Sequence, residues 1–459
     1  MQASSIREAS SDSQCLLRHR SKYWYPRGIH LQMRVLYDIS TLGLAQLYTQ
    51  SRGGSYRVDL HMTEALAGSG ACELLFCANH STVAYHGCEA FLRNHHRLGK
   101  VPLIGSARHQ ATSSVGSLAS VAHRGARRLF GTTVLPSAVR GLGRLIDRRL
   151  RPAVVDALLP VDIHHSPSIP LPARSRGRSP QRLLTIYDLA YVRFKDLYST
   201  AYQRASMEAM QSVQPEDGVI TASRFTRDEL CDHGVSSPDR IHVVPLAADP
   251  RLFYPCAERE VIADARRRYG IPEGPYVLSV NSPDPRKNVS DAIHAFARVQ
   301  REGRDALASL VLTGNTGPGS DRIREALAAY PEVRRRVVVT GFVPDQDLAP
   351  LYTGAAVFVY PSIYEGFGLP PLEAMQCGTP VITTNTSSLP EVVGDGGTMV
   401  GPSDIDALAG AMLETSRHSD RRALQQRALQ QAARFSWDLS VAATLQAYRT
   451  ALRSQGPRQ

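Results

Sequence analysis

The sequence has few cysteines and no long apolar run. Its seven cysteines are odd in number and include no Cys-x-x-Cys pair. This argues against a disulfide framework or a structural zinc site and favours a reducing, cytoplasmic compartment. No apolar run approaches the roughly 20 residues that span a bilayer, so no transmembrane helix is predicted. With 459 residues, 43% of them hydrophobic, the chain is long enough for two domains with sizeable cores.

Lysine is also scarce. Only four of the 53 basic residues are lysines, so the formal net charge of +11 reflects a preference for arginine and is weak support for nucleic-acid binding. No nucleic-acid partner is predicted. The charge is uneven, because residues 1–255 carry 31 basic and 20 acidic side chains whereas residues 256–459 carry 22 of each. The whole positive excess therefore lies in the first half.

The second half alternates short apolar segments with helical stretches. Segments that are apolar throughout are typical of parallel strands covered on both faces, which predicts a doubly wound α/β domain. Ligands of such sheets bind beyond the carboxyl ends of the strands, so the loops there are the first candidates for a site. The predicted strands lie at 276–281, 309–313, 337–340, 356–360 and 380–383.

The first half mixes strand-like and helical patterns. In residues 33–255 the pattern begins with a strand-like run at 34–39 and ends with a proline-bounded linker at 247–255. Residues 1–32 lack apolar periodicity. We therefore expect a disordered leader or a mis-assigned start, with Met33 as the true first residue.

Two cationic residues follow the strand at 276–281. The segment Pro283-Asp-Pro-Arg-Lys-Asn288 places Arg286 and Lys287 at the expected start of a helix. Free N–H groups, the helix dipole and two full charges together suit phosphate oxygens. The alternative is a solvated surface pair. The position after a strand and the use of lysine in an arginine-rich chain favour the phosphate site.

The loop after the strand at 356–360 contains two glycines and two glutamates. Gly366 and Gly368 let the backbone approach a ligand closely and present N–H donors. Glu365 lies in the loop and Glu373 in the first turn of the next helix, so both carboxylates are predicted to face one pocket. The alternative treats Glu373 as a helix-dipole partner and Glu365 as a surface acid.

Together these motifs resemble the retaining glycosyltransferases of family 4, and among them the bacterial mannosyltransferase-like members. The resemblance is dense and specific from 275 to 400. It is thinner in the first half, where the segment 52–58 looks like the family's glycine loop. The motifs that carry it are Arg286-Lys287-Asn288, Glu365-x7-Glu373, Gly378-Thr-Pro-Val-Ile382, Ser387-Ser-Leu-Pro-Glu391 and Phe435-Ser-Trp437.

The resemblance implies the GT-B architecture, an α/β fold in which two Rossmann-like doubly wound domains face a cleft. A C-terminal helix then crosses back to the first domain. The expected organisation is the leader at 1–32, an N-terminal acceptor-binding domain at 33–255, a C-terminal nucleotide-sugar-binding domain at 256–436, the crossover helix at 437–453 and a tail at 454–459.

The resemblance also implies roles for individual residues. Arg286 and Lys287 would hold the donor diphosphate, Glu365 would contact sugar hydroxyls, Glu373 would bind the ribose and Asp188 the acceptor hydroxyl. The implied catalytic residues are Glu365, Asp188, Arg286 and Lys287. The implied donor-binding residues are Gly53, Gly54, Arg286, Lys287, Glu365, Gly366, Phe367, Gly368, Leu369 and Glu373, together with Phe342 and Val343 beside the base.

One residue departs from the family. Many members have a His-Asp pair where this chain has Tyr187-Asp188. Tyrosine donates a hydrogen bond but does not act as an imidazolium, so the contact that the histidine makes is in doubt. His164 and His165 are possible replacements, and we expect them instead to be ordinary loop residues.

Two Asp-x-Asp pairs are not interpreted as metal sites. Asp345-x-Asp347 and Asp404-x-Asp406 each open a predicted helix, where capping and helix-dipole roles are expected. We therefore predict neither a catalytic metal nor a cofactor.

The activity that the resemblance implies is retaining transfer of a hexose from a nucleotide sugar to a glycan or lipid-linked acceptor in cell-surface polysaccharide synthesis. Mannose from GDP-mannose is expected from its frequency in the family. Two alternatives stay open: a catalytically inactive scaffold that binds nucleotide sugars, and a GT-B epimerase or phosphorylase. Free UDP release or an epimerised product without acceptor would identify the epimerase, and pyridoxal phosphate absorbance with dependence on orthophosphate would identify the phosphorylase.

The residues 105–151 predict an anionic membrane surface as a second partner. They contain nine arginines and a single acid, interleaved with apolar residues, so helices with one apolar and one cationic side are expected. Each basic residue beside an anionic bilayer contributes about 1 kcal/mol, and salt screens this attraction. The alternative is a solvated helix face in an arginine-rich chain.

We expect this segment to cause stronger co-sedimentation with anionic than with neutral vesicles, and the difference to disappear at high salt. Equal binding to both vesicle types would contradict the prediction. The difference should also disappear when four arginines are changed to glutamine, namely Arg124, Arg127, Arg128 and Arg144.

Overall fold

The computed structural model describes residues 32–47, 54–104, 160–172, 180–280, 284–302, 307–314 and 320–454. The cationic segment at 105–151 and nearly all of the leader and the tail lie outside these residues. No helix in the described part of the chain is long and apolar enough to cross a membrane.

The first sheet has six parallel strands in the order β2-β1-β3-β4-β5-β6. β1 pairs with both β2 and β3, with Val35 opposite Leu74 on one side and Ile163 on the other. β1, β2 and β5 are mainly apolar because helices cover both faces of the sheet, whereas β3 and β4 also bury polar side chains, among them His164, His165 and Arg182. The strands are β1 (Arg34–Asp38), β2 (Glu73–Cys77), β3 (Ile163–Pro167), β4 (Gln181–Thr185), β5 (Gly218–Thr221) and β6 (Ile241–Val243).

The helices of the first sheet form two hydrophobic cores with it. One core joins β1, β2 and β3 to α1, α2 and α3, and the other joins β4 and β5 to α7, α8 and α9. α9 begins after Ser223, whose hydroxyl oxygen accepts a hydrogen bond from the Thr226 N–H and so caps the helix. The helices are α1 (Ser40–Leu47), α2 (Gly54–Ser69), α3 (Thr82–Arg93), α7 (Ala190–Arg193), α8 (Thr200–Gln211) and α9 (Arg224–Asp232).

The second sheet also has six parallel strands, in the order β12-β11-β10-β7-β8-β9. All five strands predicted from the sequence are present, with ends that differ by one residue at most, so the doubly wound prediction is confirmed. The strands are β7 (Tyr276–Val280), β8 (Ser309–Thr313), β9 (Val337–Gly341), β10 (Val357–Tyr360), β11 (Val381–Thr384) and β12 (Thr398–Val400).

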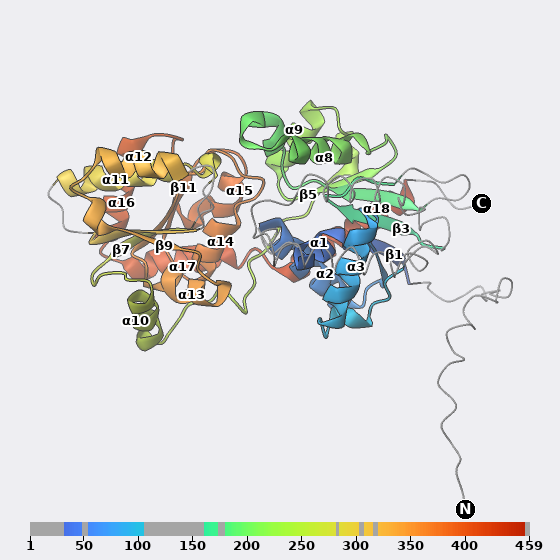
Figure 1. Cartoon of the computed structure of the whole chain (residues 1–459), viewed down its shortest axis with the longest axis horizontal. Coiled ribbons are helices and arrows are strands. Elements are labelled where there is room, and N and C mark those ends of the chain that lie inside the picture. The colour runs from blue at the N-terminus through green and yellow to red at the C-terminus, as the bar shows by residue number, and fades with distance from the viewer. Residues whose placement is uncertain are drawn as a thin grey trace, which may run out of the picture. The chain divides into compact units, whose positions relative to one another are not determined.

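Helices lie on both faces of the second sheet, with α11 and α16 on one side and α13 and α17 on the other (Figure 1). The apolar face of α11 includes Phe296, which is fully buried against the sheet. Burial of such a side chain contributes about 1.5–3 kcal/mol. The helices are α10 (Arg259–Arg268), α11 (Val289–Arg301), α12 (Ser320–Ala329), α13 (Asp345–Gly354), α14 (Leu369–Gln376), α15 (Leu389–Val393), α16 (Ile405–Arg417) and α17 (Arg421–Ala432).

The last helix, α18 (Trp437–Arg453), returns to the first sheet. It contacts α2, β4 and β5, and its buried residues Val441, Leu445 and Tyr448 belong to the core of β1 and α2. The predicted crossover helix is therefore confirmed.

Residues 244–258, which contain the predicted linker, join β6 to α10 without helix or strand. The domain boundaries at 255 and 436 remain a proposal.

The structure corrects one prediction about the two histidines. His164 and His165 are not loop residues but lie in β3, both fully buried. The ring nitrogens of His165 meet the hydroxyls of Tyr448 at 2.6 Å and Thr185 at 2.7 Å, and burial lowers the pKa of His165 to about 3. A neutral histidine inside the sheet holds β3 against α18 and does not replace the family histidine.

Candidate functional site

The strand order of each sheet creates the place for a site. The order reverses between β1 and β3 in the first sheet and between β7 and β10 in the second. Ligands of such sheets bind beyond the carboxyl ends of the strands at this point. Residues 284–288 follow β7 and residues 361–368 follow β10, and these two strands are paired. The topology therefore brings both predicted motif loops together.

A cleft with a volume of about 780 Å³ lies at these loops and is lined by residues of both sheets' connections. Small-molecule sites commonly have volumes of about 300–1,000 Å³. Ten of the predicted site residues line it, namely Gly54, Asp188, Arg286, Lys287, Glu365, Gly366, Phe367, Gly368, Leu369 and Glu373.

Three predicted residues are not among those that line the cleft. Gly53 lies outside the described residues. Phe342 follows β9 with 65% of its surface exposed, and Val343 is buried. Neither is in the cleft wall, so their place beside a base remains a prediction.

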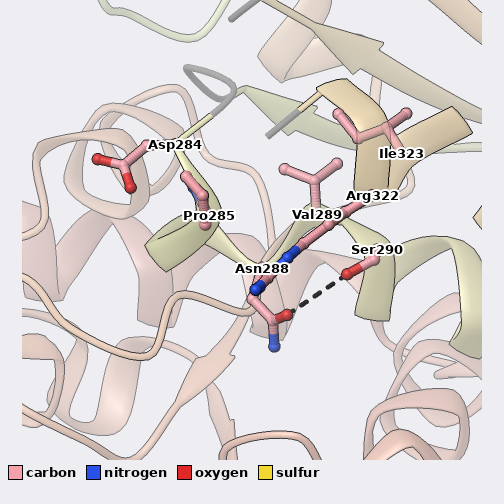
Figure 2. Close-up of a pocket in the computed structure, with 7 residues that line it drawn as sticks. All are labelled: Asp284, Pro285, Asn288, Val289, Ser290, Arg322 and Ile323. Carbon is pink, nitrogen blue, oxygen red and sulfur yellow. Dashed lines mark hydrogen bonds between the residues drawn. The ribbon is translucent and has the colours of Figure 1, made fainter. Parts of the chain in front are cut away.

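A smaller hollow lies behind the 284–288 loop and does not suit a nucleotide (Figure 2). Its volume is about 10 Å³, and a single water needs at least about 10–15 Å³. The hydroxyl of Ser290 donates to Asn288 Oδ1 at 3.5 Å across it. Asn288 adopts a left-handed backbone with a φ of 51°, so this hollow belongs to the turn that starts α11.

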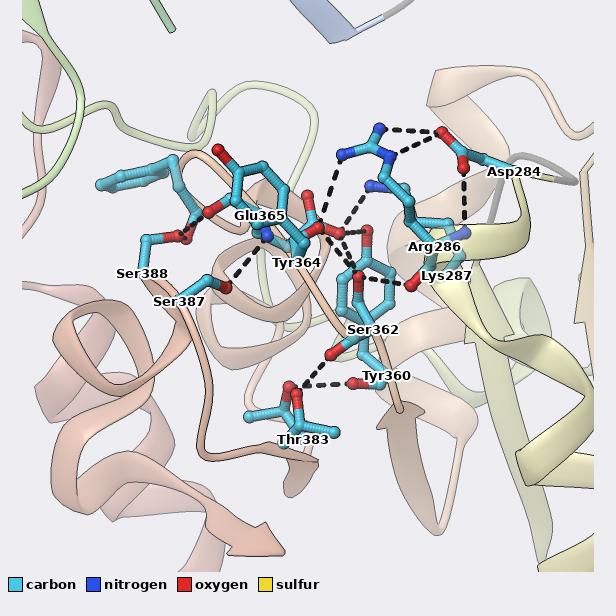
Figure 3. Close-up of polar contacts among 12 residues, drawn as sticks. Asp284, Arg286, Lys287, Tyr360, Ser362, Tyr364, Glu365, Thr383, Ser387 and Ser388 are labelled. Carbon is cyan, nitrogen blue, oxygen red and sulfur yellow. Dashed lines mark hydrogen bonds and ion pairs between the residues drawn. The ribbon is translucent and has the colours of Figure 1, made fainter. Parts of the chain in front are cut away.

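Lys287 and Glu365 form the central ion pair of the cleft (Figure 3). Lys287 Nζ donates to Glu365 Oε1 at 2.5 Å. The same oxygen accepts hydrogen bonds from the hydroxyls of Tyr360 at 2.8 Å and Ser362 at 2.7 Å. Glu365 is therefore not the surface acid of the alternative interpretation, since only 8% of it is exposed.

The surroundings of Glu365 keep it ionised. Burial alone raises the pKa of Glu365, but the charges of Lys287 and Arg286 outweigh it and the pKa is lowered overall. Its backbone is also held, because the N–H of Glu365 donates to Ser387 Oγ and its carbonyl accepts from Ser388 Oγ, both at 2.9 Å. The two motif loops thus present a fixed carboxylate, Glu365, and a fixed cation, Lys287, to the cleft.

Arg286 is the second cation of the site. Its guanidinium donates from Nη2 to Asp284 Oδ2 at 2.8 Å and lies 5.7 Å from the ring centre of Tyr198 and 6.0 Å from that of Tyr364. Only 8% of Arg286 is exposed. This rules out the alternative in which Arg286 and Lys287 are a solvated pair on the surface. A bound phosphate would meet a guanidinium that is already oriented by an acid and two aromatic rings.

Glu373 lines the cleft from α14. It lies beyond the first turn of this helix, where the sequence had placed it. Its Oε1 accepts from Arg57 Nη2 at 2.9 Å, and its Oε2 accepts from the hydroxyl of Tyr352 at 3.2 Å. Burial, the largest influence, raises the pKa of Glu373 despite the nearby charge of Arg57. Arg57 also donates to Asp345 at 3.3 Å, so Asp345 pairs with a cation and does not only serve the helix.

Arg57 is a site residue that sequence reasoning missed. It lies in the segment 52–58 that resembles the family's glycine loop, three positions after Gly54. A Cβ on Gly54 would meet nothing within 4 Å, so the start of α2 is open to the cleft. The signal for Arg57 was its spacing of one helical turn from that glycine.

The two loop glycines have different structural roles. A Cβ on Gly366 would lie 2.2 Å from the Tyr187 carbonyl oxygen and 2.7 Å from Asp188 Cβ. Only glycine therefore lets the 361–368 loop approach residues 187–188 of the first sheet's wall. Gly368 has a φ of 115°, which disfavours any side chain and starts α14. The sequence had suggested ligand approach as the reason for both.

Tyr187 contacts an acid of α2. Its hydroxyl donates to Asp59 Oδ1 at 2.5 Å, and Asp59 is 1% exposed. Burial, the largest influence, raises the pKa of Asp59 to about 6, although the Tyr187 hydrogen bond opposes this rise. The neighbouring Asp188 is partly buried in the cleft wall, and its Oδ1 accepts from the Ala190 N–H at 3.0 Å. The Tyr187–Asp59 hydrogen bond therefore holds the connection between β4 and α7, which carries Asp188, against α2.

The raised pKa of Asp59 predicts a pH dependence of stability. Because the folded protein holds this proton more tightly than the unfolded chain, its contribution is full below pH 4 and is lost as pH rises through about 6. A difference of about 2 in pKa corresponds to about 3 kcal/mol. Asp59→Asn should flatten this part of the unfolding free energy measured between pH 4 and 7. An unchanged slope in the variant would contradict the assignment.

The two Asp-x-Asp motifs combine helix capping with ion pairs. Asp404 Oδ1 accepts from the Ala407 N–H at 2.9 Å and caps α16, as predicted. Asp347 instead pairs with Arg268 at 2.8 Å.

Among the described residues, Asp38, Cys77 and His164 could supply three metal ligands. Both oxygens of Asp38 already accept backbone N–H groups, from Ser40 and Asn79, so this cluster ties strand ends together.

Two Rossmann-like parallel sheets, a cleft lined from both and a C-terminal helix that returns to the first sheet define the GT-B fold. Solved structures agree. Sucrose-phosphate synthase from Thermosynechococcus elongatus matches with a TM-score of 0.62 at 21% identity, over 91% of this chain and 98% of that one. Anabaena HepE in complex with UDP-glucose matches with a TM-score of 0.59 at 16% identity, over 90% and 99%.

Sequence relatives place the chain in a family. The family described as "Glycosyl transferases group 1" matches residues 261–433. O-antigen chain mannosyltransferase B of Escherichia coli is 32% identical over 289 residues, which cover 62% of this chain and 74% of that protein. MMP α-(1→4)-mannosyltransferase of Mycolicibacterium hassiacum is 33% identical over 266 residues, which cover 56% and 60%. The chain belongs to the group 1 glycosyltransferases, family 4, a family of retaining hexosyltransferases.

Proposed function

We propose that this glycosyltransferase transfers mannose from GDP-mannose to a glycan or lipid-linked acceptor in the synthesis of a cell-surface polysaccharide. The observation that carries the proposal is the Lys287–Glu365 ion pair beside Arg286 in the cleft wall. It combines two cations suited to a diphosphate with a carboxylate suited to sugar hydroxyls. The mannose assignment is supported by the two similar mannosyltransferases.

The donor fits the groups on the second sheet. Arg286 and Lys287 hold the diphosphate, and Gly54 at the open start of α2 approaches it from the other wall. Glu373 accepts hydrogen bonds from the ribose, and Glu365 contacts the sugar near the N–H groups of Gly366–Leu369. The complex of HepE with UDP-glucose supports a nucleotide-sugar donor for this fold.

The chemistry requires fixed charges at the leaving group. As the bond between the anomeric carbon and the diphosphate breaks, negative charge grows on the diphosphate and the sugar becomes oxocarbenium-like. Arg286 and Lys287 meet that charge without reorganising, because Asp284 and Glu365 already hold them in place. One such contact commonly lowers the barrier by about 3 kcal/mol. Asp188 contacts the acceptor hydroxyl whose oxygen forms the new bond.

A panel of nucleotide sugars tests the donor. We expect GDP-mannose to give the fastest release of nucleoside diphosphate, and transfer to require an acceptor and to retain the α-configuration. Faster release from another donor would replace mannose. An epimerised sugar without acceptor would favour the epimerase, dependence on orthophosphate the phosphorylase, and binding without turnover across the panel the inactive scaffold.

A location on the cytoplasmic side is part of the proposal. Nucleotide sugars are the donors, and the cationic segment at 105–151 is expected to meet an anionic bilayer there. Because that segment lies outside the described residues, the vesicle experiment tests this part separately from the donor panel.

A further inference from the structure

One wall of the cleft is built by the helix α8 of the first sheet. Tyr202, Ala205, Ser206 and Ala209 all line the cleft. Their spacing of three, four and seven positions places them on one helix face. The face therefore combines one large ring with three small side chains, which leave room beside that ring.

The ring of Tyr202 is exposed and yet held in place. Its residue is 53% exposed, while its ring stacks on that of Tyr198 at 5.3 Å between centres and 20° between planes. The rings of Tyr191 and Tyr202 are arranged edge to face, with 6.4 Å between their centres and 78° between their planes. Two aromatic neighbours restrict the rotamers of Tyr202, so little conformational entropy is lost when a ligand covers its ring.

This wall adjoins the proposed reaction centre. The guanidinium of Arg286 lies 5.7 Å from the ring centre of Tyr198, on which Tyr202 stacks. Asp188, the proposed contact of the acceptor hydroxyl, lines the same cleft as Tyr191 and Tyr202. A ligand on Tyr202 would thus be next to a group that reacts between Asp188 and Arg286.

We propose that Tyr202, supported by Tyr198 and Tyr191, is a stacking subsite for a sugar unit of a glycan acceptor. The inference rests on the proposed function and narrows its acceptor to a saccharide chain. A sugar ring has one face of C–H groups, whose positive edge suits the negative face of an aromatic ring. The small residues Ala205 and Ala209 leave space for the following unit of the chain.

Binding of saccharides tests the subsite without any donor turnover. Mannotriose, maltotriose and chitotriose would be titrated into the full chain and followed by ligand-observed NMR, with GDP and UDP titrated separately. We expect Tyr202→Ala to weaken the best trisaccharide by about 10-fold or more. Tyr202→Phe should bind it within about 2-fold, because stacking needs the ring and not the hydroxyl. Nucleotide affinity should not change.

A matched control is Tyr254→Ala, because Tyr254 is 48% exposed and is not part of the cleft wall. It should bind the trisaccharide as the native chain does. Unchanged trisaccharide affinity in Tyr202→Ala would overturn the subsite, as would failure of the native chain to bind any of the three probes.

Two further results would also overturn the subsite. Equal losses in the phenylalanine and alanine variants would indicate a hydrogen bond from the hydroxyl in place of stacking. A loss of nucleotide affinity would indicate that the ring stacks on a base. Failure of the proposed function would look different, because trisaccharide binding would persist while no donor in the panel reacts.

Discussion

Changing Lys287 to alanine is expected to lower the rate of sugar transfer by about 100- to 1,000-fold, since one fixed contact to developing leaving-group charge has this value. Glu365→Ala should have a comparable effect, because it removes the proposed sugar contact and leaves Lys287 without its 2.5 Å partner. Initial rates with saturating donor and acceptor, measured beside thermal unfolding, provide the test.

Lys100→Ala is the matched control for the lysine. Lys100 is exposed at the end of the 3₁₀ turn Leu98–Lys100 and is not in the cleft wall. The control should transfer sugar at the native rate. The Lys287 variant should remain folded, because Glu365 keeps the hydrogen bonds from Tyr360 and Ser362. Near-native rates in both site variants would remove the donor-site assignment.

The second large effect is expected at Glu373. Glu373→Ala should weaken nucleotide binding by about 10- to 100-fold, because charge-assisted hydrogen bonds to the ribose are lost. Turnover at saturating donor should fall far less, since the ribose is remote from the reacting carbon. Titration calorimetry with the nucleoside diphosphate measures the nucleotide affinity, and steady-state kinetics measures the turnover at saturating donor.

Glu373→Gln and Glu414→Ala complete this test. Glutamine keeps an acceptor oxygen without the charge and should lose less affinity than alanine does. Glu414 is an exposed acid of α16 outside the cleft wall, so its variant should bind the nucleotide normally. A fall in turnover with unchanged nucleotide affinity would instead place Glu373 at the reacting sugar.

Local patterns were sufficient for five of the six strands in the second half of the chain, and only the three-residue β12 was not predicted. The five predicted strands are apolar because helices cover both faces of the sheet, so each can be recognised as a short apolar run without knowledge of the strands that it pairs with. The loops with Arg286, Lys287 and Glu365 could be selected because they directly follow such runs, and parallel strands present these loops at one edge. The strands of the first half were harder to predict from the sequence. His164 and His165 were wrongly placed in a loop, although they belong to β3.

The sequence by itself determined the α/β class, five of the six strands of the second sheet and most of the motif residues, because periodicity and loop position are properties of neighbouring residues. Only the tertiary structure decided what those residues face. Arg57 meets Glu373 across 316 positions of sequence, and Gly366 is required by the backbone of Tyr187. Tyr202 is an ordinary tyrosine of a short helix until folding exposes its ring in the cleft. Such contacts depend on how distant segments pack, and no local pattern specifies that packing.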